Sequence, residues 1–145
     1  MDAFIDTNIL IYAMEPHPTF GEKALKILEQ VDRGSIKGYI STLVLLEVCW
    51  YIEASGNIDE MKNALDNIED SRLETIEIQH SDITGAVEMK PKHREIDIND
   101  LVHYQAMKRR GITDIFTNDS HFKRLEDIKP HFKEYFYQQH GVTGA

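Results

Sequence analysis

The 145-residue sequence has one cysteine, four prolines and no long apolar run. A single Cys49 excludes an internal disulfide, and its apolar neighbours predict a buried thiol. The longest apolar stretch, residues 43–52, contains Glu47 and is well short of the roughly 20 residues that a membrane helix needs. The first residues lack the basic start and the apolar core of a signal peptide. We therefore expect a soluble, cytoplasmic protein without a membrane segment.

Basic residues are also few, because 16 Lys and Arg stand against 25 Asp and Glu, which gives a formal net charge of −9. Such a deficit argues against nucleic acid as a partner, since phosphate backbones are bound through Lys and Arg. The basic residues are unevenly distributed, however, and residues 90–133 hold ten Lys or Arg against seven Asp or Glu. That segment fits either an RNA-binding face or a solvated surface of mixed charge, and the sequence leaves the choice open.

The apolar pattern alternates between short strand-like runs and helical repeats. Strands are expected at residues 3–5, 37–40, 73–78 and 112–117, with an edge strand at 131–137. Helices are expected from residue 9, at 20–33, at 43–54, from 57 or 59, at 81–89, and from 97–100 to 111. Strands that alternate with helices predict βαβ units around a parallel sheet.

Short polar residues and glycines indicate where the helices begin and end. Either Thr7 or Asn8 can cap the first helix, and either Ser41 or Thr42 can cap the third. Gly34 ends the second helix. The basic run at 108–110 either grips RNA or ends its helix beside the negative end of the helix dipole, and we favour the helix end.

Two carboxylates stand next to or within apolar segments, where an unpaired charge is unfavourable unless it has a partner or a metal ion. Asp6 closes an apolar strand, and ligands bind at the carboxyl ends of parallel strands. A helix N-cap is the plain alternative for Asp6. Glu47 lies in a helix in which almost every other side chain is apolar, and a structural salt bridge is the alternative there.

Two further carboxylates occupy comparable positions later in the chain. Asp100 lies in the first turn of its helix, where the helix dipole alone favours an acid. Asp97 lies three residues earlier on the same side, so it stays open as a substitute. Asp119 follows the strand at 112–117 in a sequence that is common in turns. Each position is ambiguous alone, and their convergence is what points to one acidic pocket.

Clustered carboxylates favour a hard cation such as Mg²⁺ or Mn²⁺. The seven histidines include no pair at the spacing of a zinc site, so zinc is not expected. Mutual repulsion should raise the pKa of at least one carboxyl until a cation binds.

Four segments resemble, in order, the four motifs of the PIN-domain family, which includes the VapC class of toxin ribonucleases. They are FIDTNIL at 4–10, STLVLLEV at 41–48, DLVHYQA at 100–106 and IFTNDSHF at 115–122. The resemblance covers nearly the whole chain. It implies an α/β fold: one three-layer α/β/α PIN-like domain over residues 1–145, with a central, mostly parallel sheet.

The resemblance also implies a function and a set of site residues. The metal-binding and catalytic residues would be Asp6, Glu47, Asp100 and Asp119, supported by Thr7, Asn8, Asp97 and Thr117. The activity implied is a Mg²⁺- or Mn²⁺-dependent endoribonuclease that hydrolyses RNA phosphodiesters with metal-activated water. Such a protein can be the toxin of a toxin–antitoxin pair, with a small antitoxin protein as partner. The alternative is an inactive interaction module with the same fold.

Relatives of the toxin type commonly form homodimers, so the resemblance implies a homodimer as well. Apolar residues on two predicted helices supply a candidate surface for it: Phe20, Leu25, Met61 and Leu65.

Overall fold

A sheet of five parallel strands forms the centre of the computed structural model, which describes residues 1–15 and 17–132. The strands are β1 (Asp2–Ile5), β2 (Lys37–Ser41), β3 (Glu74–Ile76), β4 (Asp114–Phe116) and β5 (Lys129–His131). Their order across the sheet is β3-β2-β1-β4-β5, and every pairing is parallel. The expected parallel α/β fold is confirmed.

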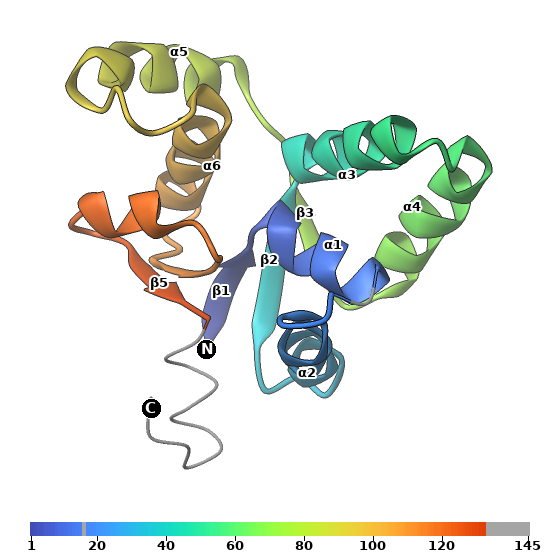
Figure 1. Ribbon diagram of the computed structural model, residues 1–145. Helices are drawn as coiled ribbons and strands as arrows, with labels where there is room; N and C mark the ends of the chain where they lie inside the picture. Colours follow the sequence, from blue (N-terminus) through green and yellow to red (C-terminus); the bar gives the residue numbers. More distant parts are fainter. Residues whose placement is uncertain (16, 133–145) are drawn as a thin grey trace.

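Helices cover the sheet on both sides. They are α1 (Thr7–Met14), α2 (Gly21–Asp32), α3 (Thr42–Ser55), α4 (Met61–Asp70), α5 (His80–Met89) and α6 (Ile98–Arg109). Short 3-10 turns lie at η1 (Ile58–Glu60), η2 (Lys90–Lys92) and η3 (Ser120–Arg124). Figure 1 shows α1 and α2 on one side of the strands and α5 and α6 on the other, so the fold has three layers. No helix within the described ranges is both long and apolar enough to cross a bilayer.

The order of the strands explains this division. The chain steps outward from β1 to β2 and β3, and it then returns to the other side of β1 to form β4. Right-handed crossovers therefore place α5 and α6 on the face opposite the earlier helices. The direction in which successive strands are added reverses between β1 and β4. Such a switch point opens a crevice at the carboxyl ends of the strands.

The central strands are apolar because they are covered on both faces. In β1 the side chains of Ala3, Phe4 and Ile5 are fully buried, and in β4 the same holds for Ile115 and Phe116. The apolar runs in the sequence therefore mark the middle of the sheet, and the first polar residue after each run marks its carboxyl edge.

An ion pair between an arginine and a buried aspartate joins α5 and α6. Arg109 donates to both carboxylate oxygens of Asp82, at 3.1 and 2.8 Å, and Asp82 is only 2% exposed. The neighbouring Lys108 and Arg110 pair with Asp127 and Glu74. This run therefore lies at the end of α6, as expected, and all three basic side chains have acidic partners within the chain.

Some local expectations were wrong. The side chain that caps α1 is that of Asp6 rather than Thr7 or Asn8, because Asp6 itself holds the extended backbone that precedes the helix. Ser41, one of the two expected residues, caps α3. Cys49 is half-buried, since it lies at the edge of the side of α3 that packs on the fold.

Two of the strands differ in extent from the expected pattern. The strand at 73–78 is shorter than expected, because β3 lies at the edge of the sheet and only residues 74–76 pair with β2. The last strand begins earlier than expected, at Lys129, and most of the segment expected at 131–137 lies outside the described residues.

Candidate metal centre

Asp6 lies at the carboxyl end of β1 and is 5% exposed. Its Oδ1 accepts a hydrogen bond of 2.8 Å from the backbone N–H of Thr7, so it caps α1. Its Oδ2 accepts from the hydroxyl of Thr117 at 2.6 Å and from the amide of Asn8 at 3.4 Å. The hydrogen bond that caps α1 uses only Oδ1. Asp6 can therefore be a helix cap and a member of the carboxylate cluster at the same time.

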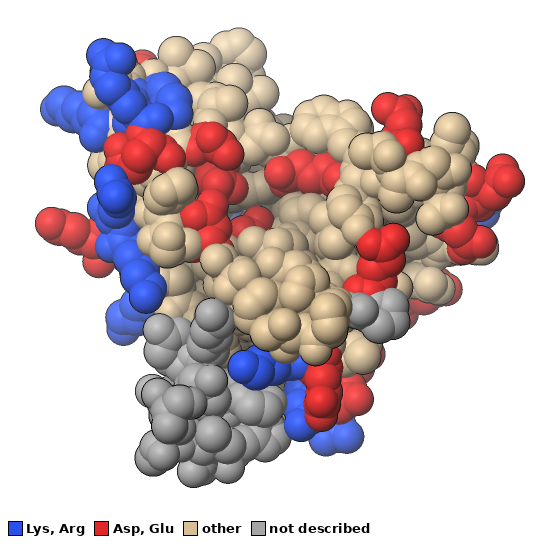
Figure 2. Space-filling model, in the orientation of Figure 1, with Lys and Arg blue, Asp and Glu red and all other residues tan. Residues whose placement is uncertain are grey.

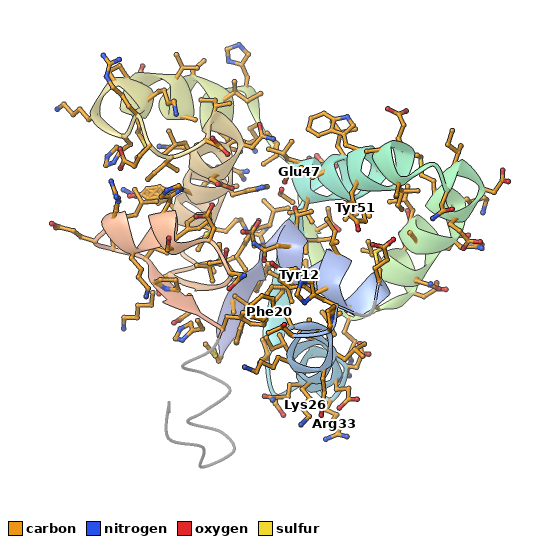
Figure 3. All side chains as sticks on the ribbon, viewed as in Figure 1. Tyr12, Phe20, Lys26, Arg33, Glu47 and Tyr51 are labelled. Carbon is orange, nitrogen blue, oxygen red and sulfur yellow. The ribbon has the colours of Figure 1, made fainter. Side chains whose placement is uncertain are left out.

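Glu47 reaches the same region from the second turn of α3. Figure 3 shows its side chain at the end of α3 that faces α6, above the strands. Its Oε1 accepts from the hydroxyl of Thr7 at 2.9 Å and lies 2.7 Å from Nε2 of His103. The sequence allowed a structural salt bridge as the alternative role of Glu47. In the structure its partner is a histidine of α6.

Asp100 and Asp119 complete the group from α6 and from the loop after β4. Their side chains share a hydrogen bond. Asp119 also caps η3 by accepting from the backbone of His121 at 2.9 Å, and its own N–H donates to the hydroxyl of Thr117 at 3.0 Å. The structure therefore brings all four expected carboxylates together at the carboxyl edge of the sheet.

Burial and repulsion shift the pKa values of these acids. Burial, followed by the charges of Asp6 and Asp119, raises the pKa of Asp100 to about 9. Burial also raises the pKa of Asp6, although the neighbouring His103 opposes the shift. Burial acts in the same direction on Glu47, but hydrogen bonds from His103, Thr7 and Asn99 outweigh it and lower its pKa. The raised pKa that was expected for at least one carboxyl is therefore found at Asp100 and at Asp6.

The donor set fits a hard divalent cation. Within the described ranges, the ion pairs of the four carboxylates are with histidines, His103 on Glu47 and His121 on Asp119. Ligand atoms of Asp6, Asp100 and His103 lie within 4.8 Å of one another. Figure 2 shows several acidic side chains around a hollow in the middle of this face, and others along its outer edges. Several carboxylate oxygens with little compensating charge are what Mg²⁺ and Mn²⁺ coordinate in proteins.

The structure separates the two acids at the start of α6. Asp97 is exposed and occupies the N-cap position, where its backbone carbonyl accepts from Asp100 and its side chain makes no cap hydrogen bond. Asp100, one turn further on, faces the other carboxylates. Asp97 therefore lies outside the cluster.

His103 is the residue that the sequence interpretation missed. Only histidine pairs were considered as ligands, and His103 has no such partner in the sequence. Its position three residues after Asp100 could have indicated that it lies beside the carboxylates, because residues three apart share one face of a helix. In the structure it is fully buried against the cluster.

The raised pKa of Asp100 predicts how the stability of the metal-free protein depends on pH. The folded carboxyl holds its proton up to about pH 9, whereas its ordinary pKa is 3.8. The free energy of unfolding should therefore fall as pH rises between these values, by at most about 1.4 kcal/mol per pH unit. Urea unfolding at pH 5.5, 7.0 and 8.5 in a chelating buffer measures this fall.

Asp100→Asn is the matched control, since it keeps the shape of the side chain but has no proton to lose. The pH dependence should be flatter in this variant, while the histidines common to both proteins contribute equally. Parallel curves for the two proteins would mean that Asp100 is ionised in the folded state.

The model of the PIN domain family matches residues 3–128 of the chain. No curated protein matches the chain. Solved structures that match include VapBC2 from Rickettsia felis bound to a DNA fragment from its promoter, at 24% identity over 90% of this chain and 98% of that chain, with a TM-score of 0.71.

Two further matches have lower identity. The Mycobacterium tuberculosis toxin VapC20, named as a sarcin-ricin loop cleaving toxin, is 14% identical over 86% of this chain and 95% of that chain, with a TM-score of 0.71. DNA-bound VapBC from Salmonella typhimurium is 17% identical over 90% of this chain and 98% of that chain, with a TM-score of 0.68. These likenesses establish the fold. With the family match over most of its length, the chain belongs to the PIN-domain family.

Proposed function

We propose that the chain is a Mg²⁺- or Mn²⁺-dependent endoribonuclease of the VapC toxin class. Its metal-binding and catalytic residues would be Asp6, Glu47, Asp100 and Asp119. The observation that carries the proposal is the convergence of these four buried or half-buried carboxylates at the switch point of the sheet, where burial and repulsion raise the pKa of Asp100 to about 9.

The surrounding side chains hold the carboxylates in position. Thr7 contacts both Asp6 and Glu47, through its N–H and its hydroxyl respectively. Thr117 joins Asp6 to the loop of Asp119. Asn8 donates to Asp6 and accepts from the backbone of Asn118. These contacts fix the oxygens before any ligand arrives, which reduces the reorganisation needed on binding.

The bound cation would activate water and stabilise the charge that develops in phosphodiester hydrolysis. In that reaction the oxygen of water bonds to phosphorus, the bond from phosphorus to one ester oxygen breaks, and that oxygen gains a proton. The contribution of the chain is to hold Glu47 ionised and to release the proton of Asp100 when the cation binds.

Basic residues at one edge of the acidic hollow support RNA as the substrate. Figure 2 shows Lys and Arg side chains along the edge that η2 and η3 occupy in Figure 1. The two turns contribute Lys90, Lys92, Lys123 and Arg124, and Arg94 follows η2. A polyanion bound along this edge would place its phosphates beside the carboxylates, so the negative total charge does not exclude RNA.

An antitoxin protein is proposed as a partner, because several of the similar structures are VapBC complexes. An apolar groove of about 600 Å³ between α1, α2, α3 and α4 offers a surface for it. The described residues that line the groove include no Lys or Arg but four acids, Glu15, Glu29, Asp32 and Glu60. A partner segment with apolar and basic side chains would match both the apolar lining and the negative charge of this groove.

A homodimer is proposed through a different surface. Leu46 and Trp50, one turn apart on α3, are 47% and 49% exposed, and Ile83 and Val87 on α5 are exposed as well. Of the residues that the sequence suggested for this contact, Leu25 lines the groove instead, and Phe20 packs against Tyr12.

The first test of the proposed function compares Asp100→Asn with Asp97→Asn. Saturating Mn²⁺ should raise the melting temperature of the parent by several degrees, since ligand at 100 times Kd adds about 2.7 kcal/mol. It should also start cleavage of long single-stranded RNA. Asp100→Asn should lose most of both effects, with cleavage lowered by about 100-fold. Asp97→Asn should retain both, because that side chain lies outside the cluster.

The outcomes separate the alternatives. Full metal-dependent cleavage by Asp100→Asn, together with loss in Asp97→Asn, would exchange the roles of the two acids. If the parent is neither stabilised by Mn²⁺ nor able to cleave any of a range of RNAs, the chain is an inactive interaction module with the PIN fold.

The second test separates the two protein contacts with a matched pair, since Leu25 and Leu46 are equally exposed. Leu25→Glu adds a charge to an acidic groove, so it should prevent co-purification of the protein encoded by the adjacent reading frame while the oligomeric state stays unchanged. Leu46→Glu should keep that partner and shift the light-scattering mass from dimer to monomer. Equal effects of the two variants on co-purification would contradict the groove as the binding surface.

A further inference from the structure

His103 lies in α6 one turn after Asp100, and its side chain is fully buried. Its ring packs against that of Phe4, with 5.3 Å between the centroids. Both ring nitrogens have polar partners, since Nε2 lies 2.7 Å from Oε1 of Glu47 and Nδ1 lies 3.3 Å from the hydroxyl of Ser41. The ring thus joins the N-cap of α3 to a carboxylate in the second turn of that helix.

The chemistry of the carboxylate fixes the direction of the hydrogen bond between His103 and Glu47. An ionised carboxylate only accepts hydrogen bonds, so Nε2 must carry a proton and donate to Glu47. Ser41 accepts from the backbone N–H of Val44 as the N-cap of α3, which leaves its own hydrogen available for Nδ1. The described residues contain no buried side-chain polar atom without a partner, so this network is complete.

The position of the Glu47 carboxylate depends on such contacts, because the side chain that carries it has three rotatable bonds. Thr7 and His103 both hold its Oε1, at 2.9 and 2.7 Å. Hydrogen bonds of this kind overcome the burial that opposes ionisation of Glu47. A carboxylate fixed in place before the cation arrives loses less conformational freedom on binding.

We propose that His103 is a positioning residue, whose Nε2–H holds the carboxylate of Glu47 beside those of Asp6 and Asp100 so that the three can bind one divalent cation. The proposal rests on the proposed function, since it assumes that the cluster binds metal. The alternative is that His103 is itself a ligand, because its ring lies within 4.8 Å of the oxygens of Asp6 and Asp100. Positioning is favoured by the geometry, since both ring nitrogens already have partners.

The test compares His103→Gln with His103→Asn and measures Mn²⁺ affinity by calorimetry, together with the metal-free melting temperature. The amide of Gln can reach the position of Nε2 and donate to Glu47, whereas that of Asn reaches only the position of Nδ1. Mn²⁺ affinity should therefore fall by about 10- to 100-fold in the Asn variant and stay within a few-fold of the parent in the Gln variant.

A purely structural histidine would lower the melting temperature of both variants and leave the Mn²⁺ affinity of the folded protein unchanged, which would overturn the proposal. Equal loss of affinity in both variants, with a changed preference between Mn²⁺ and Mg²⁺, would make His103 a ligand and overturn it as well. If the parent does not bind Mn²⁺ at all, the proposed function fails first, and this result is distinguishable from either outcome.

A double-mutant cycle adds an independent criterion. Because His103 acts through Glu47, the Asn substitution should lower Mn²⁺ affinity further by less than a factor of two in a Glu47→Ala background. Additive losses would contradict the proposal. If His103→Asn does not fold, Ser41→Ala and Ser41→Thr replace it. Affinity should then fall in the Ala variant and recover in the Thr variant, and equal affinities would contradict the role of the ring.

Discussion

The mutual repulsion of four carboxylates at the end of β1 and β4 is the constraint around which the rest of the site is arranged. Burial disfavours every charge in this place, and the repulsion between like charges adds to that effect, so the pKa of Asp100 is raised to about 9. A proton on Asp100 would then take the place of the cation in the metal-free cluster. A cation can displace that proton, so the electrostatic strain of the folded chain becomes a source of metal affinity.

The fold tolerates this strain because backbone and side-chain donors hold the remaining charges. Asp6 is the N-cap of α1 and also accepts from Thr117, and Glu47 accepts from Thr7 and His103. These donors come from different layers of the fold, so the cluster exists only when α3 and α6 meet above the sheet. Stability of the fold and geometry of the site are thus coupled through the same hydrogen bonds.

The sequence predicted the parts of the structure that depend on local pattern. Buried parallel strands are continuous apolar runs, so the first acid after such a run, Asp6 or Asp119, could be placed at the carboxyl edge of the sheet. Glu47 could be recognised because an acid is conspicuous in an apolar helix. The family motifs then supplied the grouping that no single position could.

Contacts between distant segments could not be predicted in this way. The partner of Glu47 is His103, 56 residues away, and nothing in the local sequence of either residue indicates how α3 packs toward α6. The choice between Asp97 and Asp100 likewise depended on how α6 is rotated about its axis, since both acids lie near its start. The cap of α1 is Asp6, which the sequence offered as the alternative to a metal ligand, whereas the structure shows one residue that ends the strand, caps the helix and faces the other carboxylates.

A divalent cation that binds the cluster should displace the proton held by Asp100. Calorimetric titration of the parent with Mn²⁺ at pH 7, in buffers that differ in ionisation enthalpy, measures this exchange. From a carboxyl with a pKa of about 9, we expect release of about one proton per ion bound, and a clearly smaller release from Asp100→Asn. Mn²⁺ binding with the same proton release in both proteins, or no binding at all, would contradict it.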